Sequence, residues 1–368
     1  MATITKAELK LYIYTGSKGE KPATPQYTLV KDRLASSNED TNEDIIVFEI
    51  SELVKDYVDV NFTGDYSNIE QNAWVEAVIT RTFDNDTTDI IDKTMIAFLG
   101  YGEFEDGINP ALSLGYLISN QTIFVLEGEP SNVPFYQSAE QTSINKVEYF
   151  KGASLLASRV INTNVASITV DSSSIKASSG NIRADATQKR TFNSSGFTSQ
   201  DEIPQQTTKI NTTLLDGTVE SRFVRAVSEC KRTPYRVSFI NRFGVIQDLW
   251  FFKRRDDSFD VQREDFKRSI LDIGTSSVSY NAYKGSRQAL DISAKEKLVM
   301  NTGYITEDHN EVIKQLMVTE HCWVHQNSTL TPLKPTTTSF QEKKEVDEKL
   351  LNFTVEFEVA NNYIQDIR

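Results

Sequence analysis

The sequence predicts a mainly β protein, built of several antiparallel β-sandwich-like or barrel-like modules with a few short helices. Phe and Tyr are plentiful, with 20 and 14 residues, whereas Gly and Pro are modest, with 16 and 9. Aromatic residues are enriched in strands. Apolar and polar residues also alternate in many short runs that polar, turn-forming segments separate, which is the pattern of half-buried strands.

The length of 368 residues suits two or three domains. We divide the chain into an N-terminal β-sandwich-like domain (1–135), a small β module with a long polar loop (136–225) and a C-terminal β-rich domain with one helix (226–368). A Gly- and Pro-containing segment, 127–134, marks the first boundary. Hydrophobic residues make up 39% of the chain, which supports several cores more readily than one large core.

The predicted N-terminal domain begins with a strand in which Leu9, Leu11 and Ile13 share one face. A short helix follows residue 50, with Ser51 as its N-cap. The strands expected in this domain span residues 4–14, 27–30, 45–50, 74–82, 94–99 and 117–126.

The composition changes in the middle segment, where short apolar runs are separated by Ser, Thr, Asn and Gly. Its expected strands are 147–150, 158–161, 166–170 and 174–177. Residues 181–206 are polar and low in aliphatic side chains. We predict that this stretch is disordered in an isolated subunit and becomes ordered against neighbours.

The C-terminal domain is organised around a β-hairpin, 235–252, whose turn lies at 241–244. Gly244 supplies a positive φ, and the second strand is apolar on both faces, so it should be buried on both sides. The expected packing partners of this hairpin are a strand at 351–359 and a helix at 307–317, capped by Thr306.

The remaining C-terminal segments are also assigned from sequence. We expect Lys253–Asp257 to be a charged loop, and Pro332 and Pro335 to mark a turn or a sheet edge. Further strands are expected at 261–270, 276–283, 289–300 and 321–325.

Five Phe and Trp residues of the hairpin are candidates for core or interface, and the hairpin carries no catalytic chemistry. They are Phe239, Phe243, Trp250, Phe251 and Phe252. We interpret them as domain core, with a subunit interface as the alternative if some of them are exposed.

Two segments contain metal-ligating residue types. His321, Cys322 and His325 offer zinc ligands, but alternation along a strand points Cys322 away from both histidines. The loop 84–89 is rich in oxygen ligands for calcium but lacks the Gly and the terminal Glu of an EF-hand loop. We therefore expect 321–325 to be an ordinary strand and 84–89 to be a solvated loop. We expect the protein to bind no metal and no cofactor.

Enzyme signatures are weak. The Gly-rich segment 100–107 carries three carboxylates where a phosphate cradle needs amide donors and a Lys. Hydrolase, zinc-protease and nucleotide-binding motifs are missing from the sequence, and it holds three histidines. Glu356 and Glu358 lie on the outer face of a predicted strand, where cross-strand pairing is the default. We predict that the protein is not an enzyme.

The net charge of −13 argues against nucleic-acid and anionic-membrane partners. The basic cluster 253–255 is followed by two Asp residues and fits an ion-paired hairpin end. Two cysteines do not make a disulfide framework. The first residues lack a secretory pattern, and no run reaches the length of a membrane helix, so we expect synthesis in a cytoplasm.

Three segments resemble virion structural proteins of tailed bacteriophages, particularly phages of Bacteroidetes-type hosts. They are 230–253, with its Asn-Arg-Phe-Gly and Gln-Asp-Leu-Trp-Phe-Phe-Lys runs, 349–360, and 8–14 taken with 48–54. The resemblance implies a tail, neck or baseplate protein that is located in the virion and assembles into a symmetric ring. Its partners would be other copies of itself and other virion proteins.

Two alternatives remain open at this stage. One is a tail fibre that recognises host-surface glycan, with Trp74, Tyr101 and Phe104 as candidate contacts. The other is a tail enzyme that cleaves glycan with a pair of carboxylates.

Overall fold

The computed structural model is mainly β, with several antiparallel sheets and two α-helices among the described residues, which confirms the predicted fold class. Among these residues no helix is long and apolar enough to cross a membrane. The residues that the structure describes are 4–15, 20–33, 46–60, 62–64, 72–103, 115–126, 130–132, 134–136, 144–160, 191–193, 206–214, 216–273, 277–280, 283, 285–326, 329–339 and 350–360.

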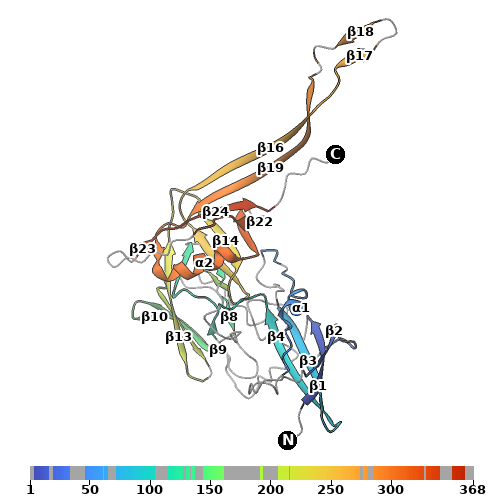
Figure 1. Ribbon diagram of the computed structural model, residues 1–368. Coiled ribbons are helices and arrows are strands. Elements are labelled where there is room, and N and C mark those ends of the chain that lie inside the picture. Colours follow the sequence, from blue (N-terminus) through green and yellow to red (C-terminus); the bar gives the residue numbers. More distant parts are fainter. Residues whose placement is uncertain are drawn as a thin grey trace.

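The first sheet has four antiparallel strands in the order β2-β1-β3-β4 (Figure 1). They are β1 (Ile4–Tyr14), β2 (Tyr27–Asp32), β3 (Asn72–Phe83) and β4 (Thr88–Phe98). One face buries Leu9, Leu11 and Ile13 at 2% exposure or less, as the alternation predicts, and packs near the short helix α1 (Ser51–Lys55).

Two predictions about this region were wrong. Residues 46–50 do not form a strand, because an apolar run makes a strand only where a partner edge is available to pair with it. Ile50, not Ser51, is the N-cap of α1, and the Ser51 hydroxyl is engaged by Glu49 instead of a helix amide.

The second sheet has the order β10-β9-β12-β13-β6. Its strands are β6 (Thr122–Leu126), β9 (Ile144–Lys151), β10 (Ser154–Val160), β12 (Lys209–Leu214) and β13 (Val219–Val227). β6 pairs in parallel with β13, so these pairings cross the predicted boundary at residue 135. Two small ladders join β5 (Gly115–Tyr116) to β8 (Phe135–Tyr136) and β7 (Pro130–Asn132) to β11 (Thr191–Asn193).

The third sheet has seven strands in the order β15-β14-β21-β22-β24-β19-β16. They are β14 (Tyr235–Ile240), β15 (Ile246–Phe251), β16 (Arg255–Lys267), β19 (Arg287–Asn301), β21 (Cys322–Gln326), β22 (Thr329–Pro335) and β24 (Thr354–Val359). A minor ladder joins β20 (Ile305–Thr306) to β23 (Leu350–Leu351). The predicted hairpin is therefore present, and its second strand is buried on both sides.

The largest core lies between this sheet and the helical segment η4 (Glu307–His309) and α2 (Asn310–Val318). Val312, Ile313 and Leu316 are at most 1% exposed, which confirms the predicted helix stripe. Thr306 stands at the predicted N-cap, but its hydroxyl contacts the Asp308 carboxylate rather than a backbone amide.

Pro332 and Pro335 were predicted to mark a turn or a sheet edge, which was wrong, because both lie in the interior strand β22. β22 pairs with β24 only from Leu333 to Pro335. Pro332 therefore stands just outside that ladder, and its carbonyl accepts a hydrogen bond from the Ala360 amide at 3.0 Å. The missing N–H of a proline is tolerated where no ladder bond is required.

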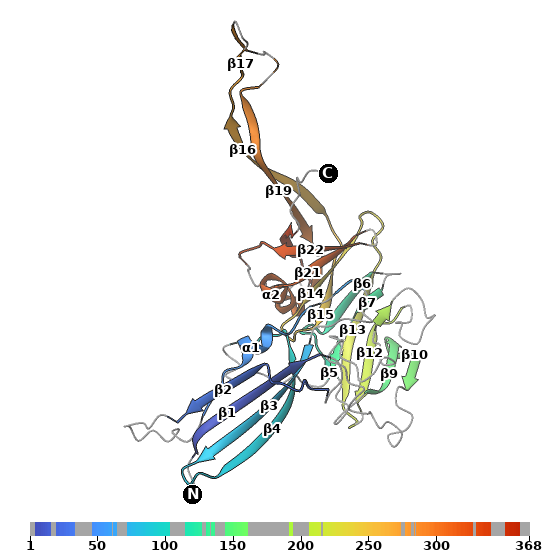
Figure 2. The ribbon, with the colours of Figure 1, turned by 90° about the vertical axis from the view of Figure 1, so that its right-hand side faces the viewer.

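A long two-stranded arm, formed by β16 and β19, extends far out of the body in both views (Figures 1 and 2). The small hairpin β17 (Leu271–Ile273) and β18 (Val278–Tyr280) continues it to its tip. Its strands were predicted only in part, since β16 already begins at Arg255, inside the expected charged loop 253–257. The strands expected at 166–170 and 174–177, and nearly all of 181–206, lie outside the described residues.

Candidate functional site

The turn of the central hairpin is held by a buried chain of amide side chains. Asn241 Nδ2 donates to the Leu117 carbonyl at 2.7 Å and to Gln247 Oε1 at 3.0 Å. Gln247 Nε2 donates in turn to Asn120 Oδ1 at 3.0 Å. All three amide side chains are buried, and a buried polar group left unsatisfied costs about 1–3 kcal/mol. This chain therefore fixes the hairpin against the segment that leads into β6.

Two glycines bring the first sheet against the same turn. The amide of Tyr101, just after β4, donates to the Arg242 carbonyl at 2.9 Å. A Cβ added at Gly100 would lie 2.5 Å from that carbonyl oxygen, which is closer than real Cβ atoms come. Gly244 has a φ of +75°, so it needs glycine for its backbone conformation as well as for space.

Asp308 connects the start of the helical segment to the second sheet. Its Oδ2 accepts the backbone amides of Gln121 at 2.6 Å and Thr122 at 2.7 Å, and its Oδ1 lies 3.1 Å from His309 Nδ1. Burial by itself would raise the pKa of this carboxyl, but hydrogen bonds from His309, Thr306 and the Thr122 amide outweigh it and hold the pKa well below its usual range.

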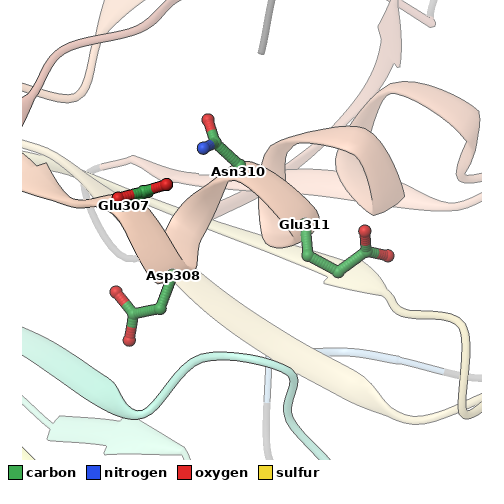
Figure 3. Close-up of a pocket in the computed structure, with 4 residues that line it drawn as sticks. All are labelled: Glu307, Asp308, Asn310 and Glu311. Atoms are coloured by element: carbon green, nitrogen blue, oxygen red, sulfur yellow. The ribbon is translucent and has the colours of Figure 1, made fainter. Parts of the chain in front are cut away.

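An open pocket of about 400 Å³ surrounds Asp308 and is lined by Glu307, Asp308, Asn310 and Glu311. Figure 3 shows that the four side chains point in different directions, with Asp308 turned away from the helix. A hard cation needs several oxygen ligands that converge on one point. We therefore interpret the pocket as the solvent-exposed side of the contact between Asp308 and the Gln121 and Thr122 amides.

A Ser, a His and an Asp meet on the face of the seven-stranded sheet opposite the main core. Ser238 Oγ lies 2.6 Å from Asp248 Oδ1 and 2.7 Å from His325 Nε2. His325 Nδ1 lies 3.0 Å from Arg236 Nη2. Sequence reasoning missed this group, although Arg236, Ser238 and Asp248 stand out as polar residues in an apolar hairpin.

The direction of the protons in this group follows from Arg236. An arginine can only donate, so His325 Nδ1 accepts, and Nε2 carries the proton of the neutral ring and donates it to Ser238. The Ser238 hydroxyl then donates to Asp248. In a catalytic triad the histidine takes the proton of the serine, which is the opposite direction. Ser238 is also completely buried, so the group forms a structural chain from a cation to an anion.

Burial of the His325 ring supports this neutral form. Desolvation lowers the pKa of His325 to about 4, with Asp248 raising it and Arg236 lowering it by smaller amounts. The ring packs at 6.0 Å from the Phe62 ring, which belongs to the segment covering this face.

The predicted zinc-ligand types do not come together. Cys322 is 2% exposed in the main core, and burial raises the pKa of its thiol. His325 lies on the opposite face of β21, as alternation predicts, and His321 stacks on Trp323 with a centroid distance of 6.0 Å. Among the described residues, no group of three or more His, Cys, Asp or Glu side chains could hold a metal ion.

The solvated loop predicted at 84–89 is shorter than expected. Thr88 and Asp89 belong to β4, and Asp89 forms an ion pair with Arg81 across the hairpin, with a 2.8 Å contact from Arg81 Nε. A carboxylate that already has a cationic partner is a poor cation ligand.

The five predicted aromatic residues are core rather than surface. Phe239 and Phe251 are 0% exposed, Phe252 and Trp250 are buried, and Phe243 is partly buried. The Phe251 ring meets Phe357 edge to face at 5.8 Å, which places the hairpin against the predicted 351–359 strand.

The arm, by contrast, exposes apolar side chains. Phe259 is 52% exposed, Val261 is 44% exposed and Leu290 is 67% exposed. On β19 the apolar positions continue outward from Leu298 and Met300, which are buried in the main core. The apolar face of the sheet therefore continues from the main core onto the arm, where the described part of the body does not cover it.

The other candidate residues are distributed over the molecule. Trp74 is buried, Tyr101 is 39% exposed, and Phe104 lies outside the described residues. Lys253 pairs with Glu229 at 3.0 Å, and Glu358 pairs with Lys295 at 2.9 Å. The glycan-contact candidates thus do not form one exposed aromatic surface, and the basic cluster begins with an ion pair.

No protein-family model, no curated protein and no solved structure matches this chain.

Proposed function

We propose that the chain is a non-enzymatic structural component of a tailed-bacteriophage virion: a tail, neck or baseplate protein that assembles into a symmetric ring. The observation that carries this proposal is the arm, which reaches out of the body (Figure 2). Several apolar side chains of the arm are exposed. Together with the sequence resemblance, it favours a protein whose surface is completed by neighbours.

The arm is expected to be only weakly stable in an isolated chain. A two-stranded ribbon alone in water is marginally stable. Full burial of one Val, Leu or Phe side chain contributes about 1.5–3 kcal/mol. Since Phe259, Val261 and Leu290 remain about half exposed or more, contact with another protein would stabilise the arm substantially.

The body fits the role of a rigid base for this arm. The buried amides around Asn241, the contact of Gly100 with Gly244 and the Asp308 hydrogen bonds fix the three sheets to one another. Forces applied at the arm would then move the subunit as one piece.

The two alternatives gain no specific support. Host-glycan recognition relied on Trp74, which is buried, on Tyr101, and on Phe104, which lies outside the described residues. Glycan cleavage would need a pair of carboxylates. Of the two on the outer face of the predicted 351–359 strand, Glu358 is ion-paired with Lys295 on the neighbouring strand.

The test uses purified particles and an arm-shortened chain. Mass spectrometry of particles should detect the protein at a low copy number, on the order of six to twelve, as expected for one closed ring. Replacing 263–292 by Asn-Gly joins Gln262 to Ser293, which already face each other, through a two-residue turn. We expect this chain to fold and to be missing from particles. Normal incorporation of the shortened chain, or absence of the wild-type protein from particles, contradicts the proposal.

A further inference from the structure

The outer part of β16 has a charge pattern that is complementary to itself. Residues 264–268 read Glu-Asp-Phe-Lys-Arg, so two carboxylates precede Phe266 and two cations follow it. When this segment is paired antiparallel with a second copy of itself, Glu264 lies opposite Arg268, Asp265 lies opposite Lys267, and Phe266 lies opposite Phe266. Each carboxylate then meets a cation.

The partner strand within the chain does not offer this match. Across the β16–β19 ladder, Glu264 faces Asp291 and Lys267 faces Arg287. Like charges directly opposite each other destabilise a strand pair. Arg268 donates to neutral oxygens, the Gly285 carbonyl at 3.3 Å and Gln288 Oε1 at 3.2 Å. Directly across the ladder, neither Glu264 nor Lys267 therefore meets a residue of opposite charge.

The other edge of β16 is available for pairing. β16 is the terminal strand of the seven-stranded sheet, and the part of the chain that the structure describes places no strand beside its outer edge. Every residue of β16 after Arg255 is exposed. The outer end of β16, which finishes at Lys267, and β17 beyond it present N–H and C=O groups on this side that can extend a sheet into another chain.

We propose that two copies of this protein pair through the outer edges of their arms, antiparallel and about a two-fold axis at Phe266, so that the end of β16 in each copy lies beside Arg268 and β17 of the other. The same register brings Val261, which is 44% exposed, opposite Leu271, which is 55% exposed. Charge pairing, aromatic contact and apolar contact therefore agree on one register and on one occupant, a second copy.

The shape of the molecule permits this pairing. The arm points away from the body in both views, so antiparallel arms place the two bodies at opposite ends (Figures 1 and 2). This contact is isologous, because both copies use the same surface. A ring is built from heterologous contacts, so the arm pairing would be a second contact, separate from the one that closes the ring. The inference rests on the proposed function only in treating the arm as an assembly element.

The test is a charge swap in the full-length chain. One variant carries Glu264→Lys and Asp265→Lys, and the other carries Lys267→Glu and Arg268→Glu. Sedimentation should show the wild-type mass rising from 41.6 kDa toward twice that value with concentration. Each variant alone should associate at least about tenfold more weakly, because its arms repel. Mixing the two variants, or combining all four substitutions in one chain, should restore the dimer.

A control matched to the Lys267→Glu, Arg268→Glu variant changes the net charge by the same amount without touching the arm. Lys6→Glu with Lys93→Glu alters two exposed cations on the first sheet and should leave dimerisation as in the wild type. A wild-type chain that stays monomeric at about 100 μM, variants that dimerise as tightly as wild type, or a mixture that stays monomeric would each overturn the pairing.

The register has its own test in a chain whose exposed thiol is removed by Cys230→Ser. Phe266→Cys should cross-link two copies by a disulfide under mild oxidation, because the paired residues face each other across the axis. Phe259→Cys should not, since its opposite position is residue 273. Cross-linking at 259 but not at 266 overturns the register. The measurements need no virion, so a protein that dimerises yet is missing from particles contradicts the proposed function alone.

Discussion

Gly100 and Gly244 meet backbone to backbone where the first sheet reaches the central hairpin. A Cβ on Gly244 would lie 2.7 Å from the Gly100 amide nitrogen, and a Cβ on Gly100 would lie 3.0 Å from the Gly244 nitrogen. Neither close neighbour is a flexible side-chain end, so neither can move without shifting the chain. This contact makes the orientation of the two sheets sensitive to single methyl groups.

We expect Gly244→Ala to lower the free energy of unfolding by more than about 3 kcal/mol, because backbone strain at a φ of +75° adds to a steric clash. Gly217→Ala separates the two effects, since Gly217 has a φ of +87° and open space around it. That control should cost only about 1 kcal/mol. Urea unfolding of both variants measures the difference, and equal losses would contradict the steric argument.

Asp308→Asn should destabilise the protein on the order of 2 kcal/mol at pH 7, because charge-assisted bonds to the Gln121 and Thr122 amides weaken. The native pKa of Asp308 is lowered, so its stabilising contribution is complete above about pH 4 and is lost as the pH falls further. Urea unfolding at pH 7 and pH 3 should therefore show a smaller acid loss in the variant than in wild type. Asp92→Asn, at an exposed position on β4, should leave the wild-type loss unchanged.

His325 should titrate near pH 4, well below the unfolded value of about 6.5. Because the folded pKa is lower, stability is complete above about pH 6.5 and declines as the pH falls toward 4, on the order of 1–2 kcal/mol by pH 5. An NMR titration of the imidazole signals checks this, with His325→Gln to assign the resonance. A His325 signal that titrates at pH 6 or above would show that the ring is not held neutral.

The two cysteines should react very differently with a thiol reagent. Cys230 is exposed, whereas Cys322 is buried in the main core and burial raises the pKa of its thiol. One thiol should react in the native protein and a second only on unfolding in urea. Loss of the fast reaction in Cys230→Ser identifies the exposed group. Two fast thiols in the native state would mean that the core opens around Cys322.

The sequence by itself determined the strands whose alternation is strong. Leu9, Leu11 and Ile13 lie on one buried face of β1, and Val355 and Phe357 lie on one buried face of β24, as predicted. The hairpin at 235–252 and the stripe of α2 also follow from local pattern. These features can be predicted because side chains repeat every 2 residues along a strand and every 3.6 along a helix, which is a property of the local backbone. An element with one buried face therefore has apolar residues at that spacing.

Only the tertiary structure decided how these strands are joined. Local sequence did not indicate that β6 pairs in parallel with β13, about a hundred residues away, or that Pro332 lies in an interior strand. The Asp308 contacts and the Gly100–Gly244 contact could not be predicted from sequence either, since each joins segments that are remote in sequence. Residues 46–50 show the converse: the segment is rich in apolar residues, but it forms no strand. A strand exists only where another edge completes its hydrogen bonds, and that edge is supplied by the fold as a whole.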